Sequence, residues 1–353
     1  MGRLSHCGCC ILPPELLLRI ARNGNPSQRE AALDTLAVDH TLRLGRATWQ
    51  LLDGGTRRGL FGISSAGKQR SIYDAHGAEA LPGRLVRAEG AAAQADVEVN
   101  EAYDGLGATF DFFADVYDRN SIDDAGLHLD ATVHYGRRYD NAFWNGRQMV
   151  FGDGDAEIFN RFTISLDVIA HELTHGVTGD EARLVYLGQA GALNESVSDV
   201  FGSLVKQYAR RERAADADWL IGAGLFTAKV HGVALRSMKA PGTAYDDPLL
   251  GRDPQPATMD GYVRTQADDG GVHTNSGIPN HAFYLAAIAL GGYAWEKAGR
   301  IWYETLRDKR MKPTATFRQF ARLTVQNAAH FFGNAERQAV AAAWAEVGIK
   351  ATG

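Results

Sequence analysis

The chain has 353 residues, of which 45% are apolar and 22% charged, as is typical of a globular protein with more than one core-bearing unit. This composition is unlike that of a disordered or membrane-spanning chain. The formal net charge of -5, without a block rich in Lys or Arg, argues against a nucleic-acid partner.

The N-terminus contains all of the cysteines. Cys7, Cys9 and Cys10 are the three thiols of the chain, so the rest of the sequence holds no disulfide framework. The apolar region of a secretory signal is also missing, because residues 13–15 interrupt the short run Leu16–Ile20. The Sec export route is therefore not indicated, although other routes leave no such mark.

The first segment predicts a small helical unit. Pro13 and Pro14 favour a helix start, and the pair at 23–24, Asn-Gly, favours a stop. Ser27, with Glu30 three residues later, has the spacing of a capping box for a second helix. The unit ends at the Gly-rich, dibasic stretch 53–58, where we expect a flexible and cleavable joint. Its apolar stripe consists of Leu16, Leu17, Ile20, Ala31, Leu33, Leu36, Leu42 and Leu44.

The remaining chain divides into a β-rich part and a helical part. Between about residues 59 and 165, the stretches 133–136 and 149–154 predict strands that meet turns, with one helix near Val97–Val116. After residue 166, helical periodicity dominates and no internal repeat is found. The fold class is therefore α+β. We expect helices at Ser165–Gly176, Ala192–Arg210, Ile278–Leu290, Ala294–Leu306, Thr316–Phe331 and Ala335–Val347.

A His-Glu-x-x-His motif lies on the first of these helices. Residues four apart share one face of an α-helix, so His171 and His175 can reach one metal ion while Glu172 lies beside it. A hydrolytic zinc site needs a third ligand and an open position. Glu195 is our candidate, on what we expect to be the next helix. The alternative interpretation is a surface helix with ordinary polar residues.

The motif has a wider context that resembles the thermolysin-type neutral metalloproteases, from about residue 70 to the C-terminus. The N-terminal Pro-Pro-Glu-Leu at 13–16 is similar to the short propeptide of the protealysin-like branch. The resemblance implies a β-rich and an α-helical domain with a zinc ion in the cleft between them. It is carried by residues 171–175, 191–196, 141–144, 152–155, 235–238, 269–273 and 275–277.

The resemblance also implies a role for each site residue. Glu172 would accept a proton from the zinc-bound water and pass it to the leaving nitrogen. Tyr186 and His273 would donate to the oxyanion, and Asp268 would orient His273. Asp199, four residues after Glu195, should accept a hydrogen bond from His171. The substrate backbone would be held by Asn141, Ala142 and Arg236, and the residue after the cleaved bond by the apolar Phe159, Phe162, Val168 and Leu235.

Several of these assignments have simpler alternatives. Tyr186 could be an ordinary core or edge tyrosine, and Asp268 a turn residue. Calcium is possible, because Asp167 and Asp218 match acids of the thermolysin calcium cluster. Where the family often has two further glutamates, this chain has Lys206 and Ala223. We expect the Lys206 ammonium to pair with both aspartates and to replace the ions of a double calcium site.

These observations predict a precursor of a zinc endopeptidase that cleaves on the amino side of bulky hydrophobic residues. Residues 1–55 would form a propeptide that blocks the cleft and is removed by self-cleavage, followed by domains at 56–180 and 181–353. In the precursor, a thiolate of Cys7, Cys9 or Cys10 could instead bind the zinc. A catalytically silent zinc-binding interaction protein is the rival. The protease would be secreted without a recognisable signal, with a cytoplasmic location as the alternative.

Overall fold

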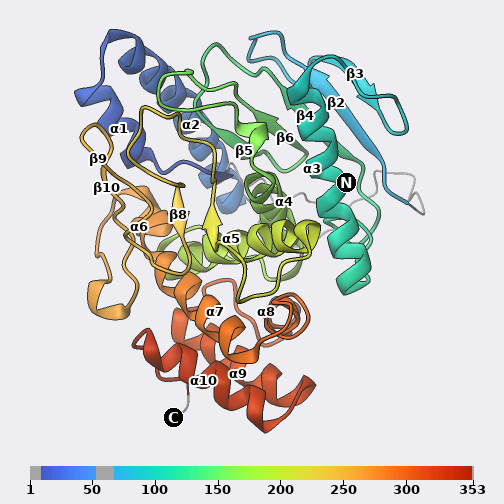
Figure 1. Cartoon of the computed structure of the whole chain (residues 1–353), viewed down its shortest axis with the longest axis vertical. Helices are drawn as coiled ribbons and strands as arrows, with labels where there is room; N and C mark the ends of the chain where they lie inside the picture. Colours follow the sequence, from blue (N-terminus) through green and yellow to red (C-terminus); the bar gives the residue numbers. More distant parts are fainter. Residues whose placement is uncertain (1–8, 53–66, 352–353) are drawn as a thin grey trace.

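The computed structural model describes residues 9–52 and 67–351, and the side chains of residues 10–42 and 67–351. Within these ranges the expected α+β organisation is confirmed. Figure 1 shows a sheet-containing part above a layer of helices, with α5 crossing between them. The expected joint at 53–58 lies outside the described residues.

The sheet has six strands in the order β1-β5-β6-β4-β2-β3. Strand β4 lies between β2 and β6 and is parallel to both. The remaining neighbouring pairs are antiparallel. The long helix α3, Val97–Tyr117, packs against β2 and β4. The strand bounds are β1 Cys9–Cys10, β2 Arg70–Asp74, β3 Arg84–Ala88, β4 Leu129–Val133, β5 Ala142–Trp144 and β6 Gln148–Phe151.

The edge strand β1 was not expected, because the cysteine-rich start of the chain has no strand periodicity. Cys9 pairs with Trp144 and Cys10 with Phe143, in antiparallel register. The N-terminal unit therefore adds its own strand to the sheet of the following domain.

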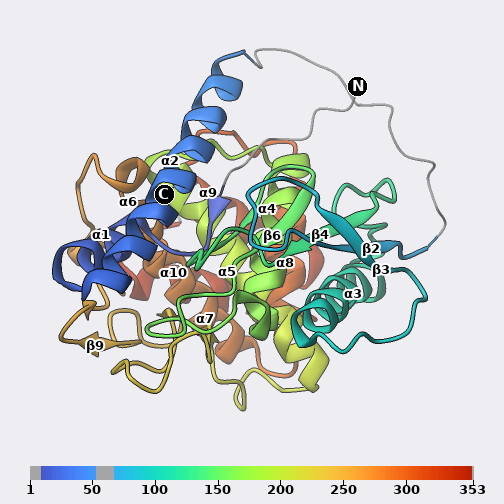
Figure 2. The same ribbon diagram turned by 90° about the horizontal axis from the view of Figure 1, so that it is seen from above.

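The rest of the N-terminal unit is a helical hairpin of α1, Pro14–Asn23, and α2, Pro26–Leu52. Figure 2 shows the two helices together along one side of the molecule. The predicted stop at Gly24 is confirmed. The predicted Ser27 capping box is wrong: Asn25 and Gln28 form it, each side chain accepting from the other's backbone N–H.

Pro26 explains the difference. Proline lacks a backbone N–H and fits the first turn of a helix, so α2 begins before Ser27. The side chains of Ser27 and Glu30 instead bind Arg138, at 2.6 and 2.8 Å.

The helical part is built around α4, Leu166–Glu181, and α5, Gly188–Arg210, which both extend beyond the predicted limits. They pack closely because Gly202 lies against the backbone of α4: a Cβ there would be 2.5 Å from the carbonyl oxygen of Asp167. Further helices are α6 Asp268–Asn275, α7 Gly277–Leu290, α8 Ala298–Leu306, α9 Phe317–Phe331 and α10 Asn334–Glu346. Short strands are β7 Leu220–Ile221, β8 Arg236–Ser237, β9 Asp246–Asp247 and β10 Gly251–Arg252.

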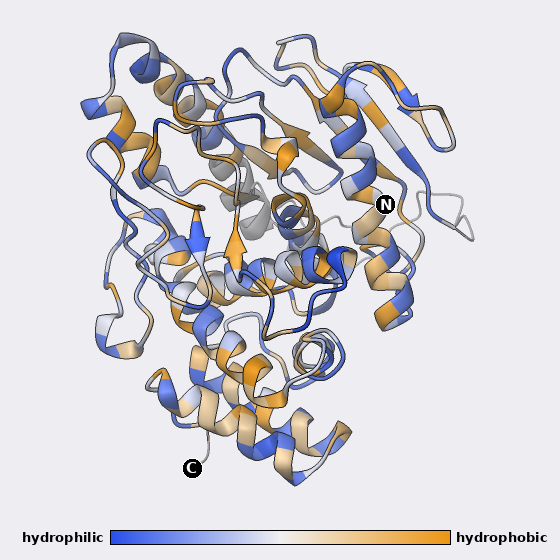
Figure 3. Cartoon of the chain, viewed as in Figure 1, coloured by the Kyte–Doolittle hydropathy of each residue, from blue (hydrophilic) through white to orange (hydrophobic). Residues whose placement is uncertain are grey.

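The core is continuous across all of these parts. Helix α7 contacts both α5 and α10 and is apolar along most of its length (Figure 3), as expected for a helix covered on more than one side. The same cluster of buried residues contains Ile11, Leu12 and Leu16 from the N-terminal unit. Among the described helices, none has both the length and the apolarity needed to cross a bilayer.

A buried lysine joins α5 to the start of α4, and the predicted pairing is confirmed. Lys206 Nζ lies 2.8 Å from a carboxylate oxygen of Asp167 and 2.8 Å from one of Asp218. It also donates to the carbonyl oxygen of Leu220, at 2.7 Å. Lys206 is only 4% exposed, so the charge of its ammonium is neutralised inside the protein rather than by water.

We predict that Lys206→Met lowers the free energy of unfolding by about 3 to 5 kcal/mol, because it leaves the buried carboxylate of Asp167 without its cation. Urea unfolding of the full-length chain measures this, in a Glu172→Ala background that prevents self-digestion. Arg210→Met is the matched control, because Arg210 binds the same Asp218 from an exposed position and should matter by less than about 1 kcal/mol. Calcium chloride should not raise the urea midpoint of the parent protein, which keeps Lys206. Such a rise would contradict the replacement of calcium by this ammonium.

Candidate metal centre

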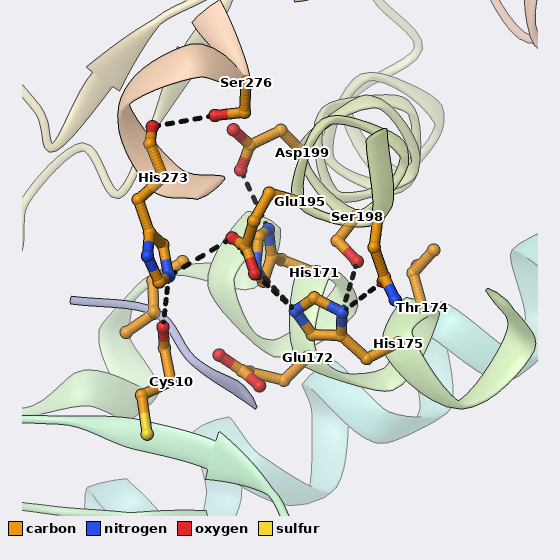
Figure 4. A network of polar contacts seen from close by, with 12 residues as sticks. Cys10, His171, Glu172, Thr174, His175, Glu195, Ser198, Asp199, His273 and Ser276 are labelled. Atoms are coloured by element: carbon orange, nitrogen blue, oxygen red, sulfur yellow. Dashed lines mark hydrogen bonds and ion pairs between the residues drawn. The ribbon is translucent and has the colours of Figure 1, made fainter. Parts of the chain in front are cut away.

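Three of the predicted site residues bring their ligand atoms together between α4 and α5. The Nε2 atoms of His171 and His175 are 3.1 Å apart, and each lies 3.5 Å from a carboxylate oxygen of Glu195. All three side chains are at most 1% exposed. Figure 4 shows them pointing toward one another from the two helices.

The other nitrogen of each ring fixes its orientation. Nδ1 of His171 donates to Asp199 and Nδ1 of His175 donates to Asn194, both at 2.8 Å. The Nε2 lone pairs therefore face one another at 3.1 Å, and Glu195 Oε2 has no hydrogen-bond partner among the described residues. Such an arrangement requires a positive charge between the three groups.

The pKa values of the two histidines also indicate that a positive charge belongs between these groups. Burial lowers the pKa of His175 to about 3, which keeps that ring neutral. Although burial opposes it, the carboxylates of Asp199 and Glu195 raise the pKa of His171 to about 9. Two imidazole nitrogens and one carboxylate are the donor set that Zn²⁺ prefers in hydrolytic sites, so the residues fit that ion.

Glu172 lies beside this centre. It belongs to a group with His171 and His175 whose ligand atoms are all within 4.8 Å of one another. One carboxylate oxygen accepts from the backbone N–H of Trp144 at 3.0 Å. The other is buried and has no hydrogen-bond partner among the described residues. Burial raises the pKa of Glu172 well above its usual range.

His273 and Tyr186 approach the centre from its other side. Asp268 accepts from both the backbone N–H of His273 and its Nδ1, at 2.9 and 2.7 Å. Although burial lowers it, Asp268 raises the pKa of His273. Nε2 of the ring then donates to the carbonyl oxygen of Cys10 at 3.0 Å. The Tyr186 hydroxyl lies 3.3 Å from the same nitrogen and donates to Glu195.

Asp199 connects the centre to Arg236. Its carboxylate accepts from His171, from Arg236 at 2.8 and 2.9 Å, and from the amide of Asn280 at 2.8 Å. Burial opposes its ionisation, but Arg236 and His171 lower the pKa of Asp199 to about 2. The predicted partner of His171 is therefore a fully ionised group with several donors.

Asn194 and Asn280 are polar neighbours of the centre that the sequence analysis missed. Asn194 accepts from His175, and Asn280 donates to Asp199. Asn194 immediately precedes Glu195 on α5, so its place beside a ligand was a signal that could have been used. No local pattern marks Asn280, because α7 approaches the site only in the folded chain.

The predicted apolar residues are all buried. Phe159, Phe162 and Val168 are inaccessible to solvent, and Leu235 lines a small cavity with Pro13 and Leu16. The rings of Phe159 and Phe162 have centroids 5.8 Å apart. These residues share the core cluster that contains Ile11.

The Cys10 thiol does not point to the metal centre. Figure 4 shows its carbonyl oxygen directed to His273 and its sulfur turned away. The side chain packs with Tyr135, Tyr139 and Phe143. The interpretation of a zinc-bound thiolate is therefore wrong for Cys10, while Cys7 and the side chain of Cys9 lie outside the described part of the chain.

A second cluster of metal-ligating residues contains Glu98, His134 and Asp153. The His134 ring lies between Asp153 and Asp96, at 3.0 and 2.8 Å. These hydrogen bonds raise the pKa of His134 to about 10. The cluster thus supplies its own positive charge and acts as an ion pair that joins the start of α3 to the ends of β4 and β6.

A helix-borne His-Glu-x-x-His group with a carboxylate from the next helix is the donor set of a zinc metallopeptidase. Two family models match the chain: "Thermolysin metallopeptidase, catalytic domain" over residues 45–179, and "Thermolysin metallopeptidase, alpha-helical domain" over residues 182–349. The chain belongs to the thermolysin metallopeptidase family and is a metalloendopeptidase.

Several relatives align over nearly their full length. An "Extracellular metalloprotease" of Pectobacterium carotovorum subsp. carotovorum is 55% identical over 97% of this chain and 96% of its own. "Protease PrtS" of Photorhabdus is 49% identical over 96% and 92%. The solved structure of the precursor of protealysin, a metalloproteinase from Serratia proteamaculans, has a TM-score of 0.88 and 55% identity, and covers 97% of this chain and 99% of that one. The chain is thus similar to the precursor of a metalloproteinase over nearly the full length of both.

We predict that Asn194→Ala raises the zinc dissociation constant about tenfold, the lower end of the effect expected for a residue that orients a ligand. The lower end applies because the Ser198 hydroxyl, 3.1 Å from the same His175 nitrogen, can replace the lost acceptor. Competition with a fluorescent chelator on the Glu172→Ala precursor measures the constant. The double variant Asn194→Ala, Ser198→Ala should lose roughly hundredfold, and an affinity within twofold of the parent in both variants would contradict the assignment.

Proposed function

We propose that the chain is the self-processing precursor of a zinc-dependent neutral endopeptidase. Residues 1–55 act as an intramolecular inhibitor of the two catalytic domains at 56–180 and 181–353. One observation carries this proposal: the backbone of residues 10–12 runs through the metal centre and binds the groups expected to hold a substrate.

The contacts follow the order of the N-terminal strand. The carbonyl oxygen of Cys10 accepts from His273, and the N–H of Ile11 donates to the carbonyl oxygen of Ala142 at 3.2 Å. The next carbonyl oxygen, that of Ile11, accepts from Arg236 at 3.0 Å. The N–H of Leu12 then donates to the Asn141 side chain at 3.1 Å. These contacts support the assignment of Asn141, Ala142, Arg236 and His273 as substrate-binding groups, with the peptide bond between residues 10 and 11 at the catalytic position.

The reaction that fits this geometry is hydrolysis of the peptide bond. When bound by His171, His175 and Glu195, zinc supplies a Lewis acid that lowers the pKa of water toward 7. Glu172 accepts a proton from the attacking water as the bond from oxygen to the carbonyl carbon forms. It returns that proton to the nitrogen as the carbon–nitrogen bond breaks. His273 donates to the carbonyl oxygen as negative charge develops there.

The Tyr186 hydroxyl has a role of its own in this reaction. Its hydroxyl now binds Glu195 and lies 3.3 Å from His273 Nε2. We propose that it donates to the carbonyl oxygen of a substrate once Glu195 is engaged by the metal. Asp268 keeps the His273 ring charged and oriented throughout.

The extracellular names of relatives support a place of action outside the cell. We therefore propose that the mature enzyme is secreted. Its substrates would be proteins or peptides encountered there.

We predict that Glu172→Ala abolishes both processing of the precursor and hydrolysis of casein, because the proton transfer then has no base. The loss in kcat should be at least about 100-fold, as for removal of a general base. Electrophoresis of the purified precursor and a casein assay measure the two activities. Glu157→Gln, on the surface beside Lys229, is the matched control and should leave both unchanged; equal behaviour of Glu172→Ala and the parent would end the endopeptidase proposal.

We also predict cleavage on the amino side of bulky hydrophobic residues. Ile11, which follows the peptide bond at the catalytic position, shares its core cluster with Phe159, Phe162, Val168 and Leu235. A charged side chain in such a site would have to be buried without a partner. Profiling the mature enzyme against a peptide library tests this, and a preference for charged residues after the cleaved bond would contradict it.

A further inference from the structure

Helix α2 of the N-terminal unit makes a second contact with the catalytic domain, away from the strand that enters the metal centre. Thr35 and Asp39 are four residues apart on one face of the helix, and both are at most 1% exposed despite their polarity. They face three consecutive residues of the catalytic domain, 139–141. The backbone N–H of Asp140 donates to the Thr35 hydroxyl at 3.0 Å.

The Asp39 carboxylate binds the side chains on either side of Asp140. One oxygen accepts from the Tyr139 hydroxyl at 2.7 Å, and the other accepts from Nδ2 of Asn141 at 2.8 Å. Tyr139 and Asn141 are themselves buried. A carboxylate buried at a helix face is costly unless donors surround it, so this contact needs both partners in place.

The contact with Asn141 decides which way its amide points. Nδ2 faces Asp39, so Oδ1 faces the opposite side, where it accepts from the N–H of Leu12 at 3.1 Å and from that of Ala142 at 3.0 Å. If the amide turned over, its NH₂ group would face two N–H donors and its oxygen would face a carboxylate. Asp39 therefore stabilises the one orientation of Asn141 that can hold the strand.

We propose that Asp39 is a positioning residue for latency: by fixing the Asn141 amide, it makes the grip on the N-terminal strand depend on the docking of α2. The inhibitory strand and the helix then bind cooperatively, through a side chain that also binds substrate. This inference rests on the proposed role of residues 1–55 as the intramolecular inhibitor.

Hydrogen exchange on the full-length Glu172→Ala precursor tests this coupling, because processing is blocked and the readout needs no catalysis. Asp39→Ala removes both acceptors and should raise the exchange rate of the peptide covering residues 9–17 by about tenfold or more, the effect of losing a hydrogen bond to a charged group. Asp39→Asn should lie between the two proteins, since its amide oxygen can still accept from Asn141. Glu30→Ala, which removes the exposed contact of the same helix with Arg138, is the matched control and should change the rate by less than about twofold.

The location of the change separates this inference from simpler roles. Faster exchange in α2 with an unchanged strand would contradict the proposal, because Asp39 would then only anchor the helix. Equal increases in α9 and α10 would also contradict it, since the variant would have loosened the whole fold. If Glu172→Ala proved as active as the parent, the proposed endopeptidase function would be rejected, while the exchange result would still report on Asp39. If only the exchange rate of the strand stayed unchanged, the role of Asp39 alone would be rejected.

Discussion

The close packing of α4 against α5 is the constraint on which the rest of the structure depends. It brings two imidazoles from one helix within 3.5 Å of a carboxylate from the other, in a region with almost no access to water. Buried polar groups persist only when their partners are fixed. The approach of the helices at Gly202, the ion pair of Lys206 with Asp167, and the donors around Asp199 all serve to hold these two helices in register.

The N-terminal unit contacts the rest of the fold at several places. It extends the sheet through β1, contributes Ile11, Leu12 and Leu16 to the main core cluster, and buries Asp39 against residues that bind the strand. Each of these contacts uses a different kind of interaction. Release of the unit therefore requires pairing, apolar packing and buried hydrogen bonds to be lost together.

The sequence was most informative where chemistry depends on spacing within one element. Helical periodicity placed His171, Glu172 and His175 on one face. The family resemblance implied that Asp199 is the partner of His171, as the structure bears out. The end of α1 followed from a local signal at Gly24. The helix expected at 316–331 matches α9, for which the structure shows Thr316 as the cap. At the start of α2 two capping signals competed, and the sequence analysis selected Ser27 where the structure uses Asn25.

Several contacts between distant segments were beyond sequence reasoning. Strand β1 forms because an existing sheet edge offers partners, not because residues 9–10 favour a strand. Asp39 has the appearance of a solvated helix residue, and only the folded chain shows it buried against Asn141. Asn280 likewise reaches Asp199 from a helix that is 81 residues away in the sequence. Such pairings depend on tertiary geometry, which periodicity and capping rules do not contain.

Strand β5 would gain an open edge if the N-terminal unit were removed. In the precursor its outer edge is satisfied by β1; without β1, its backbone N–H and C=O groups become an open edge beside the metal centre. Open edges invite any extended chain to pair with them, which suits a protein that must accept many sequences through their shared backbone. The same openness is an aggregation hazard, and β5 limits it by being only three residues long. The brevity of this strand would thus leave room for one extended chain to pair through its backbone while offering little edge for pairing between copies.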